Sequence, residues 1–179
     1  GGKLLWDSEK LMFHPDVHNY PKGHNGESFV LPTGAANGCI DLNEALADAT
    51  QTGAKAVGAN RTAKPPLARK RMDAPIEAVW MMPQGAGIKL RSKAWLDFQN
   101  DVKVSDVQLA AQEGFQSVEH AKRYTTLGMA TDQGKLSNIN GLATLAGALN
   151  TSIPDVGTTT FRPPYAPISM GSIAGIARD

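Results

Sequence analysis

The stretch 59–75 constrains the fold of this chain most, because it divides the sequence in two. It holds three prolines and five cations: Pro65, Pro66, Pro75, Arg61, Lys64, Arg69, Lys70 and Arg71. Prolines lack a backbone donor and like charges repel, so this segment opposes compact structure. We expect a solvated linker, with a basic strap on an acidic neighbour as the alternative. A nucleic-acid arm is less favoured, because no aromatic side chains interleave with the charges.

Composition narrows the class of protein further. The 179 residues suffice for one domain or two small ones, and 41% hydrophobic with 20% charged residues is ordinary for a globular protein. A net charge of +1 gives no general attraction to nucleic acid or membrane, and no apolar run is long enough to span a bilayer. We therefore expect a cytoplasmic protein with no nucleic-acid and no membrane partner. The single cysteine, Cys39, is expected to be a small buried hydrophobe.

The first part of the chain, 1–58, predicts short strands and one helix. Residues 4–6 and 29–31 are apolar and read as strands, the second one buried, while 14–26 reads as a loop. The histidines of that loop have no acidic or cysteine partner at a familiar spacing, so no metal site is expected: His14, His18 and His24. A small-residue turn over 32–38 then leads to a helix that Asp41 caps.

A strand, a glycine-bearing turn and a helix can bring backbone N–H groups to an anion. The turn over 32–38 lacks the full G-x-G-x-x-G pattern, and close helix packing explains its glycines equally well.

The second part predicts a hairpin, three short helices and an extended tail. The hairpin would pair 76–82 with 88–98 across a flexible loop at 83–87. Three amphipathic runs follow, with caps predicted at the Ser105–Gln108 pair, Ser117 and Asn138, and with ends at Gly114 and Gly128 for the first two. The tail 151–179 carries four prolines and cannot form a continuous helix: Pro154, Pro163, Pro164 and Pro167.

Two stretches carry side chains suited to chemistry. The stretch 122–135 holds three cations and four hydroxyl-bearing residues around two glycines, and 157–162 repeats the theme. Cations supply charge to a phosphate, and hydroxyl and backbone N–H groups supply directed hydrogen bonds, so together they can form an anion pocket. Helix ends with solvated charges explain the same composition. A DNA-binding helix–turn–helix is disfavoured by the near-neutral charge.

Several long motifs resemble the alpha subunit of heterotetrameric sarcosine oxidase. The stretches are 98–102, 117–135, 137–142 and 156–165. Residues 29–38 with the following helix look like the closing strand and helix of that subunit's dinucleotide-binding domain. The resemblance implies an α+β chain. Its parts would be the end of a Rossmann-like domain over 1–58, the linker 59–75, a helical module over 76–150 and the tail 151–179.

The helical module also resembles the [2Fe–2S] domain of bacterioferritin-associated ferredoxin. The positions that match its four cysteines hold Asp97, Gln99, Asp132 and Ser137. Iron–sulfur clusters need thiolate ligands, so we expect a module that kept its shape and has no iron–sulfur cluster. Asp132 and Ser137 are expected to shape the turn instead.

The resemblance also implies a function for the whole complex. Members of the family demethylate sarcosine oxidatively to glycine, pass the one-carbon unit to tetrahydrofolate and form hydrogen peroxide. FAD lies in the beta subunit, FMN at the alpha–beta boundary and NAD in the alpha subunit, with folate and zinc sites elsewhere in the complex. The partners implied are beta, gamma and delta subunits and the rest of the alpha subunit. We expect this chain to be a segment of that subunit, not catalytic alone.

The resemblance and the motifs together suggest cofactor-binding residues and no catalytic residue. FMN phosphate is expected at six side chains: Lys122, Arg123, Thr125, Thr126, Lys135 and Arg162. NAD is expected at the turn that holds Thr33, Gly34 and Ala35. Two alternatives stay open: a subunit of a related amine, opine or proline dehydrogenase, and a non-catalytic interaction module.

Overall fold

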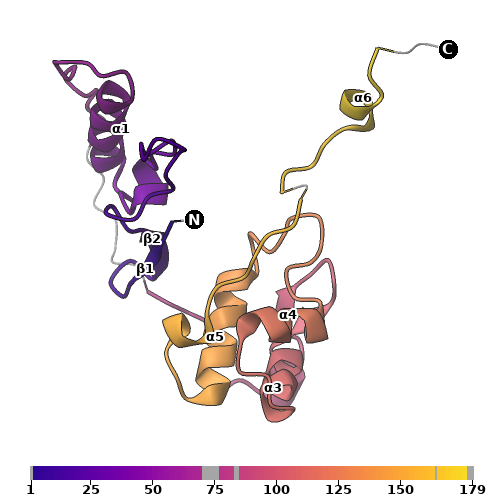
Figure 1. Cartoon of the computed structure of the whole chain (residues 1–179). Coiled ribbons are helices and arrows are strands. Elements are labelled where there is room, and N and C mark those ends of the chain that lie inside the picture. Colours follow the sequence, from indigo (N-terminus) through magenta and orange to yellow (C-terminus); the bar gives the residue numbers. More distant parts are fainter. Residues whose placement is uncertain (1, 70–76, 83–84, 164, 177–179) are drawn as a thin grey trace. The chain divides into compact units, whose positions relative to one another are not determined.

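The structure is a computed structural model that describes residues 2–69, 77–82, 85–163 and 165–176. The chain divides into two compact units, Gly1–Ala78 and Val79–Asp179, each of which is described by itself (Figure 1). Three groups of residues named above lie outside the described residues: Lys70, Arg71 and Pro75 of the predicted linker, Ile76, Pro83 and Gln84 of the predicted hairpin, and Pro164 of the tail.

The first unit begins with a hairpin. Strand β1 (Leu4–Asp7) pairs antiparallel with β2 (Met12–Pro15), and the rings of Trp6 and Phe13 meet edge to face with centroids 5.0 Å apart. One carboxylate oxygen of Asp7 accepts the N–H groups of Glu9 and Lys10, both at 2.9 Å, and so closes the turn. The strand predicted over 4–6 is confirmed. The prediction of a loop from residue 14 is wrong, because 14 and 15 complete the second strand.

The predicted buried strand over 29–31 is also wrong. Phe29 is 66% exposed and Val30 is 44% exposed, and the described residues there form no strand. A strand must pair its backbone groups, and the described part of the unit offers this run no neighbouring strand. The one bridge nearby joins Lys22 to Ser28.

A short 3-10 helix η1 (Gly34–Asn37) precedes helix α1 (Leu42–Ala56). The predicted cap is confirmed, since the Asp41 carboxylate accepts the N–H groups of Asn43 and Glu44 at 2.9 and 3.2 Å. No residue of α1 is fully buried within the described chain. Residues 59–69 form neither helix nor strand, and the Ala68 N–H donates to the Asn43 side chain at 2.8 Å.

The second unit contains a hairpin, but it is not the predicted one. Residues 88–91 form a helical turn, α2 (Ile88–Arg91), and strand β3 (Trp95–Asp97) pairs with β4 (Val102–Lys103). The N–H groups of Leu90 and Arg91 donate to the Gly87 carbonyl at 2.9 and 3.0 Å. These local bonds satisfy backbone groups that had no partner strand, because the described residues of 77–82 form no strand.

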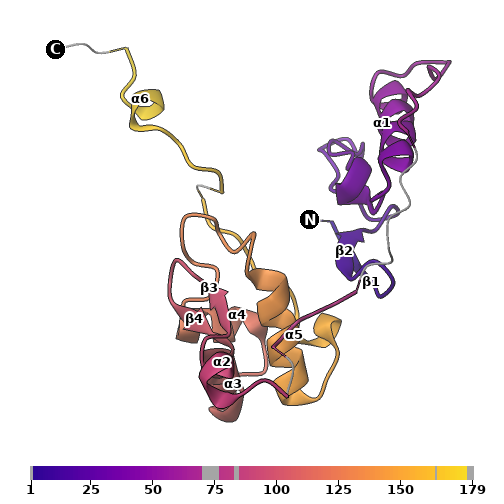
Figure 2. The ribbon, with the colours of Figure 1, turned by 180° about the vertical axis from the view of Figure 1, so that it is seen from behind.

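Three helices form the core of this unit (Figure 1 and Figure 2). They are α3 (Val104–Gln112), α4 (Val118–Thr125) and α5 (Asn138–Leu149), and α3 packs against the other two. The fully buried apolar side chains come from all three and from their loops, including Val107, Ala121, Leu127, Leu145 and Val156. The three predicted helices are therefore confirmed, as is the mixture of helix and small sheets. The Rossmann-like origin of the first part stays a prediction.

The helix ends differ from the predictions in three places. Helix α4 ends at Thr125, with Thr126 as its C-cap residue, rather than at Gly128. Lys103 is the N-cap residue of α3, and its N–H donates to the Asp106 carboxylate at 2.8 Å, so Ser105 lies inside the first turn. Asn138 is the first helical residue of α5 rather than its cap, and its side chain is buried. Gly114 follows α3 with a φ of +95°, the left-handed conformation that suits glycine.

The tail holds two short elements, η2 (Ile153–Val156) and α6 (Met170–Ile173), and is otherwise irregular over its described residues. Across all the described ranges, the helices are too short or too polar for any of them to cross a membrane.

Candidate anion-binding site

Lys122 is a buried cation on α4. Lys122 is 3% exposed, and its Nζ donates a hydrogen bond to the Thr160 carbonyl at 2.7 Å. Among the described residues this carbonyl is its one hydrogen-bond acceptor, although an ammonium has three N–H donors. A buried charge with unused donors is costly unless an acceptor or counter-charge completes it. We therefore expect an anion to bind beside the Lys122 ammonium.

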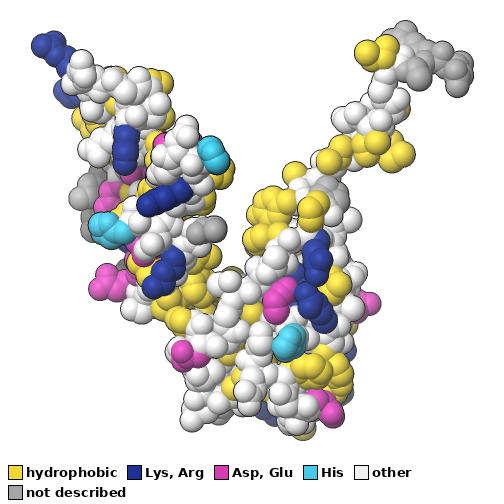
Figure 3. Space-filling view, viewed as in Figure 1, with side chains coloured by type: hydrophobic (Ala, Val, Ile, Leu, Met, Phe, Trp, Pro, Cys, Tyr) yellow, Lys and Arg dark blue, Asp and Glu magenta, His cyan; other side chains and the backbone are white. Residues whose placement is uncertain are grey.

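A cavity of about 260 Å³ opens beside Lys122. It is lined by one side chain of the tail and by others of α4 and the loop after it: Glu119, Lys122, Arg123, Met129, Gln133 and Arg162. We call these six residues the basic pocket. Three cations face one carboxylate, and the Arg123–Glu119 ion pair is loose at 3.9 Å. Figure 3 shows Lys and Arg side chains gathered beside hydrophobic ones on this unit.

The tail delivers Arg162 to the basic pocket. Gln133 accepts the Arg162 N–H at 3.2 Å with its side-chain oxygen, and donates to the Ala130 carbonyl at 3.0 Å. Glu119 accepts the Thr160 N–H at 3.4 Å. Gln133 holds a φ of +52°, which is uncommon for a residue with a side chain. The side chains that line the cavity thus also hold the tail.

Asn138 supports the loop that carries Gln133. Its amide donates to the Thr159 hydroxyl at 2.7 Å, and its oxygen is buried against Gly128 and Gly134. Both glycines have positive φ, 67° and 73°, and a Cβ on either one would overlap the Asn138 side chain. Glycine is required at both positions for two independent reasons, backbone conformation and space.

The other three residues predicted for FMN phosphate lie outside the cavity. The Thr125 hydroxyl donates to the Ala121 carbonyl at 2.8 Å, and the Thr126 hydroxyl donates to the Thr125 carbonyl at 2.6 Å. Lys135 donates to the Tyr165 carbonyl at 2.8 Å, with its Nζ 3.9 Å from the centre of that ring. The structure therefore brings together Lys122, Arg123 and Arg162, and adds Glu119, Met129 and Gln133, which the sequence analysis missed.

Comparison with known proteins identifies the family. Residues 91–176 match the family described as "Sarcosine oxidase A3 domain". The chain is 40% identical over 183 aligned residues to "Sarcosine oxidase subunit alpha" of Rhizobium meliloti (strain 1021), covering 98% of this chain and 17% of that relative. The relatives of the same name from Corynebacterium sp. (strain P-1) and Corynebacterium sp. (strain U-96) are each 36% identical, covering 99% of this chain and 18% of their own length.

The chain belongs to the sarcosine oxidase alpha-subunit family.

The resemblance predicted from the sequence is thus confirmed. The chain spans less than a fifth of the length of these sarcosine oxidase alpha subunits. Its A3 domain contains the whole basic pocket, whereas Thr33, Gly34 and Ala35 precede it.

Of the four positions that the resemblance to ferredoxin singled out, Asp97 and Gln99 bind other loops of the A3 domain. Asp97 is 3% exposed and accepts the N–H groups of Gln99 and Gly128 at 2.9 Å and of Asn100 at 3.1 Å. Gln99 accepts the Thr131 hydroxyl at 3.0 Å.

The other two of these positions differ from each other. Asp132 accepts the N–H groups of Gly134 and Leu136 at 3.2 and 3.3 Å, which agrees with a role in shaping the turn. The Ser137 hydroxyl is buried and has no hydrogen-bond partner among the described residues.

In the first unit, the turn predicted for NAD already binds a carboxylate. The Thr33 hydroxyl and the Gly34 N–H donate to one oxygen of Asp48 at 2.9 and 2.8 Å, and the Asn37 amide donates to the other at 3.2 Å. Burial alone would raise the pKa of Asp48, but these hydrogen bonds outweigh it and hold the pKa below its ordinary value. The chain's own carboxylate thus occupies the donors of Thr33 and Gly34, and NAD binding at this turn stays a prediction.

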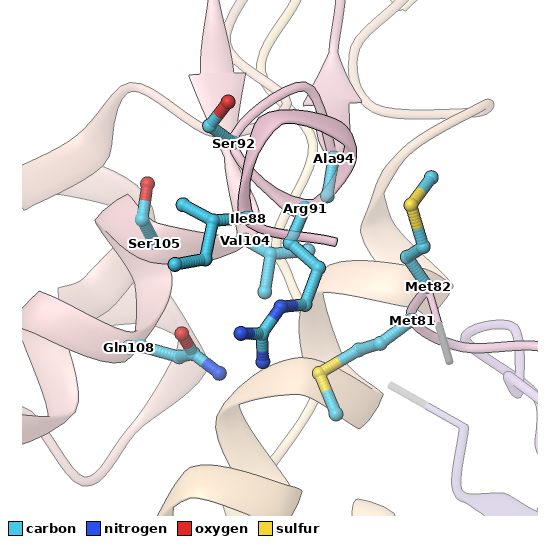
Figure 4. A pocket seen from close by; sticks show the side chains of 9 residues that line it. All are labelled: Met81, Met82, Ile88, Arg91, Ser92, Ala94, Val104, Ser105 and Gln108. Carbon is cyan, nitrogen blue, oxygen red and sulfur yellow. The ribbon is translucent and has the colours of Figure 1, made fainter. Parts of the chain in front are cut away.

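A larger and more open cavity of about 590 Å³ lies near α2. Figure 4 shows the Arg91 and Gln108 side chains directed into the same space, with Met81 beside them. None of the predicted cofactor residues lines it.

Proposed function

We propose that this chain is the part of a sarcosine oxidase alpha subunit that anchors the phosphate of FMN in the basic pocket. The observation that carries the proposal is the buried Lys122 ammonium, which has one protein acceptor among the described residues. A phosphate monoester has about 1.5 to 2 negative charges at neutral pH and several strong acceptor oxygens. Such a group matches three cations set against one carboxylate.

The size of the basic pocket supports a shared site. Its volume of about 260 Å³ lies below the roughly 300–1,000 Å³ typical of a pocket that encloses a small ligand. In this proposal the cavity takes the phosphate end of FMN, and the flavin ring lies against another surface. A partner subunit supplies that surface in this proposal, as the resemblance to the family implies.

The roles of this chain's residues are binding and orientation. Lys122, Arg123 and Arg162 hold the phosphate, and Gln133 keeps Arg162 beside it. Bound FMN would supply the acceptance of electrons and their passage to oxygen. No residue of the chain is assigned to bond breaking, so the chain by itself does not catalyse.

The remaining activity belongs to the proposed whole complex. There, FAD of the beta subunit would supply the oxidative demethylation of sarcosine, with release of hydrogen peroxide and passage of the one-carbon unit to tetrahydrofolate in another part of the assembly. The first 58 residues are proposed to be the end of a dinucleotide-binding domain. NAD contact at Thr33, Gly34 and Ala35 would require displacing the Asp48 carboxylate from the first two.

The dependence on phosphate tests the proposal directly. The ¹⁵N-labelled chain is titrated with FMN, with inorganic phosphate and with riboflavin, and amide chemical shifts are followed. We expect FMN and phosphate to shift the same amides around residues 119–123, 129–133 and 162, and riboflavin to leave them unchanged. Shifts with riboflavin equal to those with FMN, or no shifts with any of the three, would overturn it.

A further inference from the structure

A four-residue stretch of the tail is bound to α4, α5 and the loop between them through three of its residues, Thr159, Thr160 and Arg162. We call residues 159–162 the tail strap. Its hydrogen bonds run to four side chains that lie 21 to 41 residues away in sequence: Glu119, Lys122, Gln133 and Asn138. The backbone of the strap donates from Thr160 and Arg162 and accepts at the Thr160 carbonyl. Phe161 remains 44% exposed, so hydrogen bonds rather than apolar burial hold the strap.

The bonds that dock the strap belong to the basic pocket. Glu119, Lys122 and Gln133 each line the cavity and each bind the strap, and the strap contributes Arg162 to the same cavity. Without the strap, the pocket would lose one of three cations, and Lys122 would lose its one acceptor among the described residues. The basic pocket is therefore complete only while the tail strap is docked.

The charges of the basic pocket link docking of the tail strap to binding of an anion in the cavity. Placing Arg162 near Lys122 and Arg123 brings like charges together, which opposes docking while the cavity holds water alone. A dianion in the cavity reverses the sign of that contribution. Because linkage is reciprocal, a ligand that favours the docked strap must bind more tightly when the strap is docked.

We propose that the tail strap closes the basic pocket, that Gln133 is the positioning residue that holds it there, and that docking and phosphate binding stabilise each other. This inference rests on the proposed function, because it needs a phosphate monoester as the ligand. Gln133 acts through Arg162 and not by touching the phosphate with a charge.

Hydrogen exchange of individual amides in the full chain tests the coupling. We expect FMN to slow exchange of the Thr160 and Arg162 amides, which donate to Glu119 and Gln133, and riboflavin to leave their exchange unchanged. Gln133→Ala should speed exchange at Arg162 and weaken FMN binding by about five-fold, the change that one ordinary hydrogen bond supports. The unfolding temperature of each variant shows that the core remains folded.

Gln133→Glu separates positioning from charge. It keeps an oxygen that can accept the Arg162 N–H but adds a negative charge, so we expect slow exchange at Arg162 together with weaker FMN binding. FMN binding of wild-type strength in Gln133→Ala, with strap exchange that ignores FMN, would overturn the inference and leave the proposed function intact. A wild-type chain that binds neither FMN nor phosphate would overturn both.

Discussion

The Nζ of Lys122 lies 2.7 Å from the carbonyl oxygen of Thr160, 38 residues further along the chain. This bond joins helix α4 to the tail, and it takes a charge that is almost fully buried as its donor. Hydrogen bonds to charged groups contribute about 1.5–3 kcal/mol, more than neutral ones. The pair therefore secures the tail at a residue that also lines the cavity.

Glycine at position 134 should be essential for the loop. Gly134→Ala places a methyl group against Asn138 and forces a side chain into a left-handed conformation, so we expect a loss of about 1–3 kcal/mol in the free energy of unfolding. Urea denaturation measures it. Gly147→Ala is the matched control, because that glycine lies inside α5 with nothing near its missing Cβ. It should gain about 0.5–1 kcal/mol, and equal losses for both variants would contradict the account.

Asp97 should stabilise the A3 domain through its carboxylate. Asp97→Ala leaves three backbone N–H groups without their acceptor, one of them at buried Gly128, and should cost about 2–4 kcal/mol. Asp97→Asn keeps one oxygen and should cost less. Thermal and urea unfolding provide the values. Asp132→Ala removes a more exposed acceptor of two longer bonds and serves as the comparison; an Asp97→Ala cost no larger than this one would refute the role.

Asp48 should make the first unit sensitive to acid. Its pKa is lowered in the folded chain from an ordinary value of 3.8, since hydrogen bonds from Gly34, Thr33 and Asn37 outweigh the effect of burial. A lowered carboxylate pKa gives stability that is present above the unfolded pKa and is lost as pH falls through the folded one. We expect the Gly34 amide resonance to titrate with a midpoint below 3.8, and to lose that titration in Asp48→Asn.

The Asp48 prediction has an internal control. The pKa values of three other carboxyl groups are also lowered, each chiefly by a hydrogen bond. Asp7 accepts the Lys10 N–H and Asp16 accepts the His18 N–H. Asp155 accepts the Ser152 hydroxyl. These three groups titrate in both the wild type and Asp48→Asn, so they do not contribute to the difference between the two titration curves. A Gly34 midpoint above 3.8, or one unchanged by Asp48→Asn, would show that the carboxylate does not hold the turn.

The helices could be predicted from the sequence because their signals are local. Apolar residues at helical spacing identified α3, α4 and α5, and Asp41 and Gly114 identified a start and an end. The strand predicted over 4–6 was confirmed, whereas the run 29–31 failed, because a strand also needs a partner that the run itself does not identify. An apolar run such as 29–31 does not become a strand without a neighbour, and the described residues give it none.

The candidate site could be predicted in part for the same reason. Lys122 and Arg123 are adjacent to each other in the sequence and stood out as cations near glycines. Which hydroxyls would turn inward was not readable, because the Thr125 side chain bonds back to its own helix. The pairing of Gln133 with Arg162 spans 29 residues and leaves no local pattern. Asp48 was missed because it lies in mid-helix, where a carboxylate usually faces solvent.

The central claim is that the buried Lys122 ammonium binds a phosphate, and the affinity of the chain for FMN in two lysine variants tests it most directly. Lys122→Met keeps the length of the side chain and removes the charge, whereas Lys135→Met removes a cation that lies outside the basic pocket. We predict that Lys122→Met weakens FMN binding at least about ten-fold, as expected for loss of a charged hydrogen bond, and that Lys135→Met changes it less than about two-fold. Equal affinities for wild type and Lys122→Met would contradict the account.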